Sequence, residues 1–217
     1  MINYKYIKKL SISRLYGLLR RKNKSFSIRI GNLIRRMNVT DAIKKRRTVS
    51  LFINKPVSED SVIRAIEAAN YAPCHKLTFP WRFSIVNHKL RKNLMKEAFN
   101  FKYKKETCSE IPQQFKNKYL NPSHLIVARQ LLHKSEVTRL EDYAACACAI
   151  QNLMLSLTSE GIGSKWATGE FINSDIAKKL LGLDSDKEKI IGFIWIGYGE
   201  ASRSIKRPEV KEIISIL

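Results

Sequence analysis

Two arginines and a threonine, Arg46, Arg47 and Thr48, stand where a short predicted helix gives way to an extended segment. Guanidinium groups bind phosphate through paired hydrogen bonds, and a hydroxyl group both donates and accepts. The three side chains together would therefore suit a terminal phosphate. Adjacent arginines are also common on solvated surfaces, so this assignment depends on the motifs that follow along the chain.

A second unusual stretch lies between a predicted helix and a predicted strand. Pro73 should stop the helix because its ring removes a backbone N–H donor, and the residues CHK at 74–76 then lead to a strand beginning at Trp81. His75 alone is most simply a surface histidine satisfied by water. Lys76 could place a positive charge beside a bound group.

The cysteines do not suggest a metal site or a disulfide framework. They show no CxxC pair and no histidine cluster at metal-ligand spacing, and two of them lie two residues apart on a predicted helix, hence on different faces. Reduced thiols in an intracellular protein are therefore expected. The four are Cys74, Cys108, Cys146 and Cys148.

The elements that must position these residues are those of one α+β domain. Hydrophobic periodicity and capping signals predict helices over 42–47, 58–71, 139–161 and 173–183, and strands over 81–86, 123–132 and 189–199. Thr40 or Asp41 is the expected cap of the first helix. The other segments are an extended connector over 48–57, a partly helical, mobile covering segment over 88–120, a turn over 162–171 and a basic tail over 202–213.

Composition permits a folded domain with a strongly basic surface. The chain has 217 residues, 44% of them hydrophobic, a net charge of +21 and a pI near 10.0. Such a surface attracts polyanions. Residues 1–40 contain eleven lysines and arginines and no acidic residue, so about half of the net charge belongs to the N-terminal segment.

The N-terminal segment, residues 1–38, is predicted to be a basic amphipathic extension, and residues 39–217 the folded domain. Leucines and isoleucines recur among its cations at roughly helical spacing, as in a helix that lies on a membrane surface. A solvated basic arm fits equally, and a transit peptide is a third interpretation. Its apolar runs are too short to span a bilayer.

Several motifs in order resemble the FMN-dependent nitroreductase family, in particular its small, minimal subgroup. They read RRTVSLF, APCHK, FPWRF, NLMLSLTSEGIGSKWATG and IIGFIWIGYGEAS, and they extend over about residues 40–205. The resemblance implies a nitroreductase-like α+β fold with a central, mostly antiparallel sheet flanked by helices. It also implies an intertwined homodimer with the flavin pocket between its subunits.

The resemblance also implies which residues contact the flavin. Arg46, Arg47 and Thr48 would hold the FMN phosphate and ribityl chain, and Arg207 or Lys206 would be a further phosphate ligand. The residues matching contacts from the other subunit and along the ring are Tyr71, His75, Lys76, Trp166, Ala167, Thr168 and Gly169. Tyr71, Ala167 and Ser50 replace residues that are often arginine in the family.

The function implied is that of an FMN oxidoreductase. It would take a hydride from NADH or NADPH onto flavin N5 and pass electrons to a nitroaromatic, quinone or enone-like acceptor in a ping-pong order. No side chain need act as acid or base, since the cofactor carries the chemistry. The alternative is a flavin-binding or flavin-free protein of the same fold without turnover, whose basic extension binds an anionic membrane or nucleic acid.

The expected location is the cytoplasm, with peripheral membrane association and organellar targeting left open. Nucleic acid is the less favoured partner of the extension. The expected partners are a second copy of the chain and a small-molecule acceptor.

Overall fold

A computed structural model of the protein describes residues 37–104, 110–201 and 205–217. The N-terminal extension predicted over residues 1–38 lies outside the described residues, apart from its last two positions. Among the described helices, none combines the length and apolar character that a membrane crossing requires.

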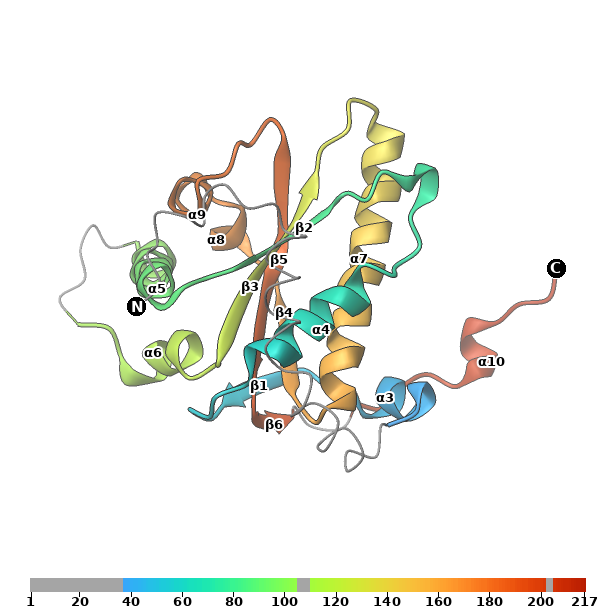
Figure 1. The fold of residues 1–217 in the computed structure, drawn as a ribbon, viewed down its shortest axis with the longest axis horizontal. Helices are drawn as coiled ribbons and strands as arrows, with labels where there is room; N and C mark the ends of the chain where they lie inside the picture. The colour runs from blue at the N-terminus through green and yellow to red at the C-terminus, as the bar shows by residue number, and fades with distance from the viewer. Residues whose placement is uncertain (1–36, 105–109, 202–204) are drawn as a thin grey trace, which may run out of the picture. The chain divides into compact units, whose positions relative to one another are not determined.

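A four-stranded antiparallel sheet forms the centre of the domain (Figure 1). Its strands lie in the order β2-β3-β5-β4, and every neighbouring pair is antiparallel. Their bounds are Trp81–Ile85 for β2, His124–Leu131 for β3, Gly163–Ala167 for β4 and Glu188–Gly197 for β5. The mostly antiparallel sheet expected from the sequence is therefore confirmed.

Two shorter strands form a separate antiparallel ribbon. Strand β1, Val49–Phe52, pairs with β6, Gly199–Ala201, which follows β5 almost directly. Thr48 also makes an isolated parallel bridge to Ser164 of β4. The ribbon thus joins the first part of the domain to the edge of the main sheet.

Helices cover both faces of the main sheet (Figure 1). On one face lie α4, Glu59–Ala69, and the long α7, Glu136–Ser159. On the other lie α5, α6, α8 and α9, whose bounds are His88–Tyr103, Gln113–Leu120, Glu170–Asn173 and Asp175–Leu181. Helix α3, Val39–Lys45, begins the described domain, and α10, Val210–Ile213, lies near its end.

The two-residue alternation of the central strands divides the core in two. Successive side chains of a strand point to opposite faces. The residues that pack with α4 and α7 include Ile126, Ala128, Ile194 and Ile196. Those that pack with α5, α8 and α9 include Leu125, Val127, Phe193 and Trp195. Both faces are apolar because helices cover both.

Side-chain caps set the starts of several helices. Ser58 accepts a hydrogen bond from the backbone N–H of Ser61, and Ser174 accepts one from Ala177. The cap of α3 is Asn38, which accepts from Asp41, so the expected cap at Thr40 or Asp41 is wrong.

Two expectations about local structure change, and a third is confirmed. Helix α4 ends at Ala69, ahead of the proline that was expected to stop it. The turn expected over 162–171 contains β4, because pairing with β5 satisfies its backbone groups. The segment 88–120 is partly helical, as expected: α5 and α6 lie on either side of residues 105–109, which are outside the described part of the chain.

The described cysteines are free thiols, as expected. Cys146 is buried, Cys74 is half-buried and Cys148 is exposed. Burial, with smaller effects from the charges of Asp142 and Cys74, raises the pKa of Cys146 to about 12. Cys108 lies outside the described residues.

Candidate functional site

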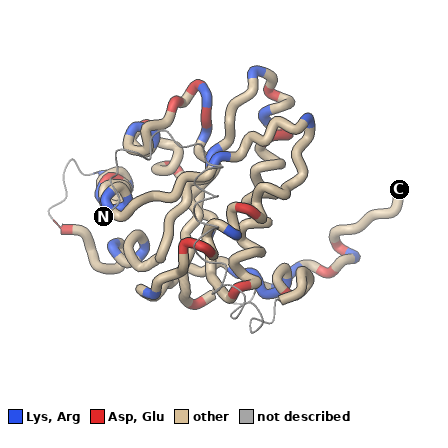
Figure 2. The backbone as a smooth tube through the Cα atoms, in the orientation of Figure 1, with Lys and Arg blue, Asp and Glu red and all other residues tan. Residues whose placement is uncertain are grey.

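A cluster of positive charge lies at the end of α3, where basic residues gather along the chain (Figure 2). Arg46 occupies the C-cap position and is half-buried. Its burial lowers its pKa, and the charges of Arg207 and Arg47 lower it further. These three residues, Arg46, Arg47 and Arg207, form the arginine cluster. Among the described residues, no carboxylate forms a salt bridge with any of them. The cluster therefore has the charge to attract an anion.

The two neighbouring arginines have different roles. The Nη1 of Arg47 donates to the carbonyl oxygens of Lys44, at 2.7 Å, and Arg46, at 2.8 Å. This guanidinium thus stabilises the C-terminal carbonyls of its own helix. Of the pair predicted to bind phosphate, Arg46 has the more available side chain.

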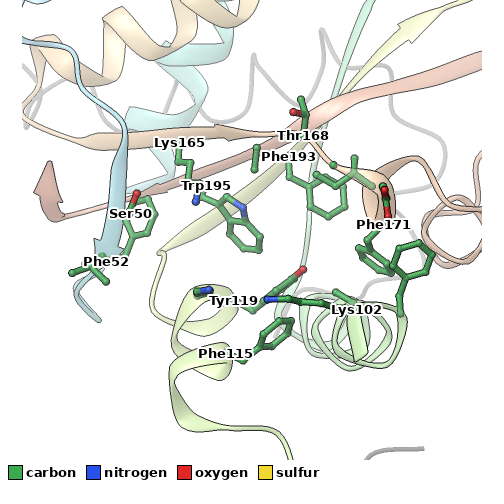
Figure 3. Close-up of a pocket in the computed structure, with 18 of the residues that line it drawn as sticks. Ser50, Phe52, Lys102, Phe115, Tyr119, Lys165, Thr168, Phe171, Phe193 and Trp195 are labelled. Carbon is green, nitrogen blue, oxygen red and sulfur yellow. The ribbon is translucent and has the colours of Figure 1, made fainter. Parts of the chain in front are cut away.

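A cavity of about 1000 Å³ lies beyond the cluster, along β1 and β4 (Figure 3). Ser50 and Phe52 of β1 line it together with Lys165 and Ala167 of β4. The bridge between Thr48 and Ser164 brings these two strands side by side. Strand β1 therefore connects the arginine cluster to the wall of the cavity.

Alternation along β4 separates the predicted contacts. Lys165 and Ala167 line the cavity, whereas the Trp166 side chain packs against the core beside α7. Its Nε1 donates to the carbonyl oxygen of Ile191 at 3.3 Å. Trp166 is therefore not among the residues that line the cavity.

Thr168 and Gly169 complete this side of the cavity. Gly169 has φ 153° and ψ 172°, a backbone conformation that is essentially restricted to glycine. A Cβ there would have no atom within 4 Å, so conformation rather than space requires glycine. The predicted segment Ala167–Gly169 thus lies together in the site.

Aromatic side chains from α5 and α6 form the opposite wall (Figure 3). The ring of Tyr119 stacks on Phe115, with centroids 5.4 Å apart, and meets Trp195 edge-on at 5.0 Å. Lys102 and Lys118 also line this wall. These residues were not among the sequence-based candidates, because α5 and α6 lack a recognisable motif; their only signal was the mixture of aromatic and basic residues.

The turn after α4 lies away from this cavity and contacts α7. Tyr71 is 87% exposed, and neither it nor His75 or Lys76 lines the cavity. His75 Nε2 lies 3.9 Å and Lys76 Nζ 3.6 Å from Glu141 carboxylate oxygens. In this chain, these three predicted contacts therefore do not join the site.

The same turn has an unusual backbone that its neighbours hold in place. Lys76, Leu77 and Phe79 all have positive φ values, 57°, 51° and 44°. The Thr78 hydroxyl donates to the buried carboxylate of Asp142 at 2.5 Å. Such backbone conformations persist where surrounding contacts determine them, and α7 supplies those contacts.

The described residues contain no group of three or more histidine, cysteine or acidic side chains that could hold a metal ion. The side chains gathered at the cluster and the cavity are arginines, lysines, hydroxyl groups and aromatic rings.

These features define an α+β protein with a cavity next to an arginine cluster, suited to a ligand with an anionic end and a planar body. The family model described as "Nitroreductase family" matches residues 43–198, and the chain belongs to this family. The resemblance seen in the sequence motifs is confirmed.

Relatives and solved structures agree with this assignment. The Bacillus subtilis protein YfhC, provisionally named an NAD(P)H nitroreductase, is 34% identical over 77% of this chain and 87% of its own length. A nitroreductase-like protein from Bacillus cereus is 25% identical, with a TM-score of 0.72 over 83% of this chain and 96% of its own. A mutant of NfnB, an FMN and NADPH-dependent nitroreductase from "sphigopyxis sp. strain HMH", has a TM-score of 0.69 at 18% identity, covering 83% and 99% of the two chains.

Proposed function

We propose that the protein is an FMN-dependent oxidoreductase that transfers a hydride from NADH or NADPH to a small acceptor. The observation that carries this proposal is the arginine cluster, unneutralised among the described residues, at one end of β1, with an aromatic-walled cavity along the same strand. A phosphate would suit the first part and a planar ring the second. The names of YfhC and NfnB support the same class of reaction.

The residues present fit FMN. Arg46, Arg207 and Thr48 would hold the phosphate, with Arg47 orienting the end of α3. The backbone of Ala167–Gly169 would lie along the ring. FMN, when bound, supplies the chemistry by accepting a hydride and passing it on.

The chain's own residues would position the reactants and exclude water. The aromatic wall of α5 and α6 limits the space beside the ring, and Lys165 contributes a positive charge on β4 close to Ser50. With the flavin ring along β4, the space left between it and the aromatic wall would suit one further planar molecule, so the nicotinamide and the acceptor would use that space in turn. This arrangement favours a ping-pong order.

The acceptor in this proposal is a nitroaromatic, quinone or enone-like molecule. The second candidate is a protein of the same fold that binds flavin without turnover, or that lacks flavin. This second candidate is favoured because Ser50, Tyr71 and Ala167 stand at positions that are often arginine in the family. Lys165 lines the cavity and would replace some of that positive charge.

The purified protein is expected to contain about one FMN per subunit and to be bleached by NADH or NADPH without oxygen. Cofactor extraction and an anaerobic titration would measure both. A colourless protein that does not take up FMN would contradict the proposal, and a yellow one that neither nicotinamide reduces would favour the second candidate.

The site is proposed to be completed by a second subunit, with Tyr71, His75 and Lys76 reaching the partner's flavin. Apolar side chains that are exposed in one subunit support this pairing, among them Leu77 at 71% and Leu140 at 72%. Several more lie in the C-terminal segment, including Val210, Ile213 and Ile216. Sedimentation of the same preparation should give a dimer, and a monomer with tightly bound FMN would exclude this arrangement.

We also propose that residues 1–38 attach a cytoplasmic enzyme reversibly to an anionic membrane. Each lysine or arginine near such a surface contributes about 1 kcal/mol, and screening acts within about 8 Å at physiological ionic strength. Deleting residues 1–38 should abolish salt-sensitive binding to anionic vesicles while FMN content and nicotinamide oxidation persist. Loss of the flavin would instead assign the extension to the folded domain, and retention by nucleic acid alone would identify a different partner.

A further inference from the structure

The wall of the cavity opposite β1 and β4 is suited to a flat ring. Tyr119, Phe115 and Trp195 form one continuous aromatic surface. Phe101 and Phe171 meet edge-on beside it, with centroids 5.8 Å apart. Aromatic rings attract one another in stacked and edge-on geometries beyond the gain from buried area, so this surface favours a planar aromatic ligand.

The same wall carries positive charge. Lys102 of α5 and Lys118 of α6 line the cavity, and no salt bridge joins either to a carboxylate of the described residues. Two further lysines and one acidic residue, Glu170, complete the charged lining. A cavity with one dominant sign of charge and apolar walls concentrates ligands of the opposite sign.

Tyr119 adds a hydrogen-bond donor to the same wall. Figure 3 shows its hydroxyl oxygen directed into the cavity. Within the described part of the chain, this hydroxyl donates no hydrogen bond to another residue. Burial raises the pKa of Tyr119 well above its usual value, so the group stays protonated and able to donate.

This positive wall is separate from the arginine cluster. Arg46 lies at the end of α3 and does not line the cavity, whereas Lys102 and Lys118 are on α5 and α6. A phosphate held by Arg46 therefore leaves both lysines available to a second anion, with Lys102 Nζ also 5.1 Å from the centroid of the Tyr103 ring.

Resting on the proposed function, we infer that the acceptor is a planar aromatic molecule bearing a carboxylate, which Lys102, Lys118 and the Tyr119 hydroxyl bind. The rings of Tyr119 and Trp195 would hold its aromatic body. A nitroaromatic acid is a suitable probe: one hydride converts its nitro group to nitroso with loss of hydroxide, which one proton turns to water, while NADH becomes NAD⁺.

The test compares two acceptors of nearly the same shape, 4-nitrobenzoate and the neutral 4-nitrobenzamide, with the full-length, FMN-loaded protein. Charge-assisted hydrogen bonds should favour the benzoate in kcat/KM by about tenfold or more. In Lys102→Gln with Lys118→Gln, this ratio should fall to about one. The matched control is Lys96→Gln, which removes an exposed charge from α5 outside the cavity lining and should keep the wild-type ratio.

Tyr119→Phe should reduce the ratio while keeping the aromatic surface. A ratio near one in the unaltered protein, or one that the double variant leaves unchanged, would overturn the inference. So would a double variant whose main effect is a higher KM for NADPH relative to NADH, since the lysines would then bind the nucleotide's phosphate.

Two measurements distinguish this inference from the proposed function. FMN content and the rate of flavin reduction by NADH test the function without any acceptor. Calorimetric binding of 4-nitrobenzoate and 4-nitrobenzamide tests the wall without turnover. A protein that is reduced normally but binds both molecules equally disproves only the acceptor class.

Discussion

Replacing Arg46 by alanine is expected to weaken FMN binding by tenfold or more. The guanidinium would form charge-assisted hydrogen bonds with the phosphate, each contributing about 1.5–3 kcal/mol, and about 1.4 kcal/mol corresponds to a factor of ten. Arg46 stands out because its half-buried charge faces Arg207 and Arg47 without a carboxylate salt-bridge partner among the described residues. Fluorescence titration of the apoprotein with FMN would measure the change.

Two further variants make this test specific. Lys45→Ala removes an exposed cation from the same helix outside the cluster and should leave FMN affinity nearly unchanged. Arg47→Ala should mainly destabilise the end of α3, because its guanidinium already donates to two backbone carbonyls. Equal FMN affinity in Arg46→Ala and Lys45→Ala would show that the phosphate is bound elsewhere.

Gly192→Ala is expected to destabilise the fold by about 1–3 kcal/mol, the range for an overpacked core. An added Cβ would lie 2.2 Å from Nε1 of Trp166 and 2.8 Å from the carbonyl oxygen of Ala167. Relief requires β4 to shift away from β5, which would move the cavity wall as well. Both the urea midpoint of unfolding and FMN affinity should fall.

A double-mutant cycle with Trp166→Leu checks the cause. Removing the indole eliminates the closest clash, so the double variant should be less destabilised than the sum of the two single variants. Strict additivity would mean that the ring is not what the new methyl group meets. An unchanged FMN affinity in a destabilised Gly192→Ala protein would show that β4 does not position the flavin.

The chain order of its motifs was enough to identify the family and most of the central sheet. Some elements could be assigned locally, because their signals come from residues that are neighbours in the sequence. These signals are Pro80-Trp81, the buried apolar run of β5 and the small residues of α7. The arginine pair at 46–47 was likewise visible, because its position after a helix is a local property. The glycine at 169 was identified only by resemblance, and its backbone conformation gives the physical reason.

Tertiary structure alone decided which of these residues share a site. The strand β4 looked like a turn because its stability comes from pairing with β5, a distant segment. Its alternation then directs Lys165 into the cavity and Trp166 into the core.

The opposite wall was equally invisible in the sequence, since Lys102, Tyr119 and Trp195 belong to three separate elements that meet only in the folded chain. The sequence by itself therefore determined the class of fold and located the adjacent arginines, of which Arg46 is proposed to bind an anion. The packing of α5 and α6 against the sheet decided the shape and charge of the cavity, because side chains far apart in the chain become neighbours only when the core that joins them is formed.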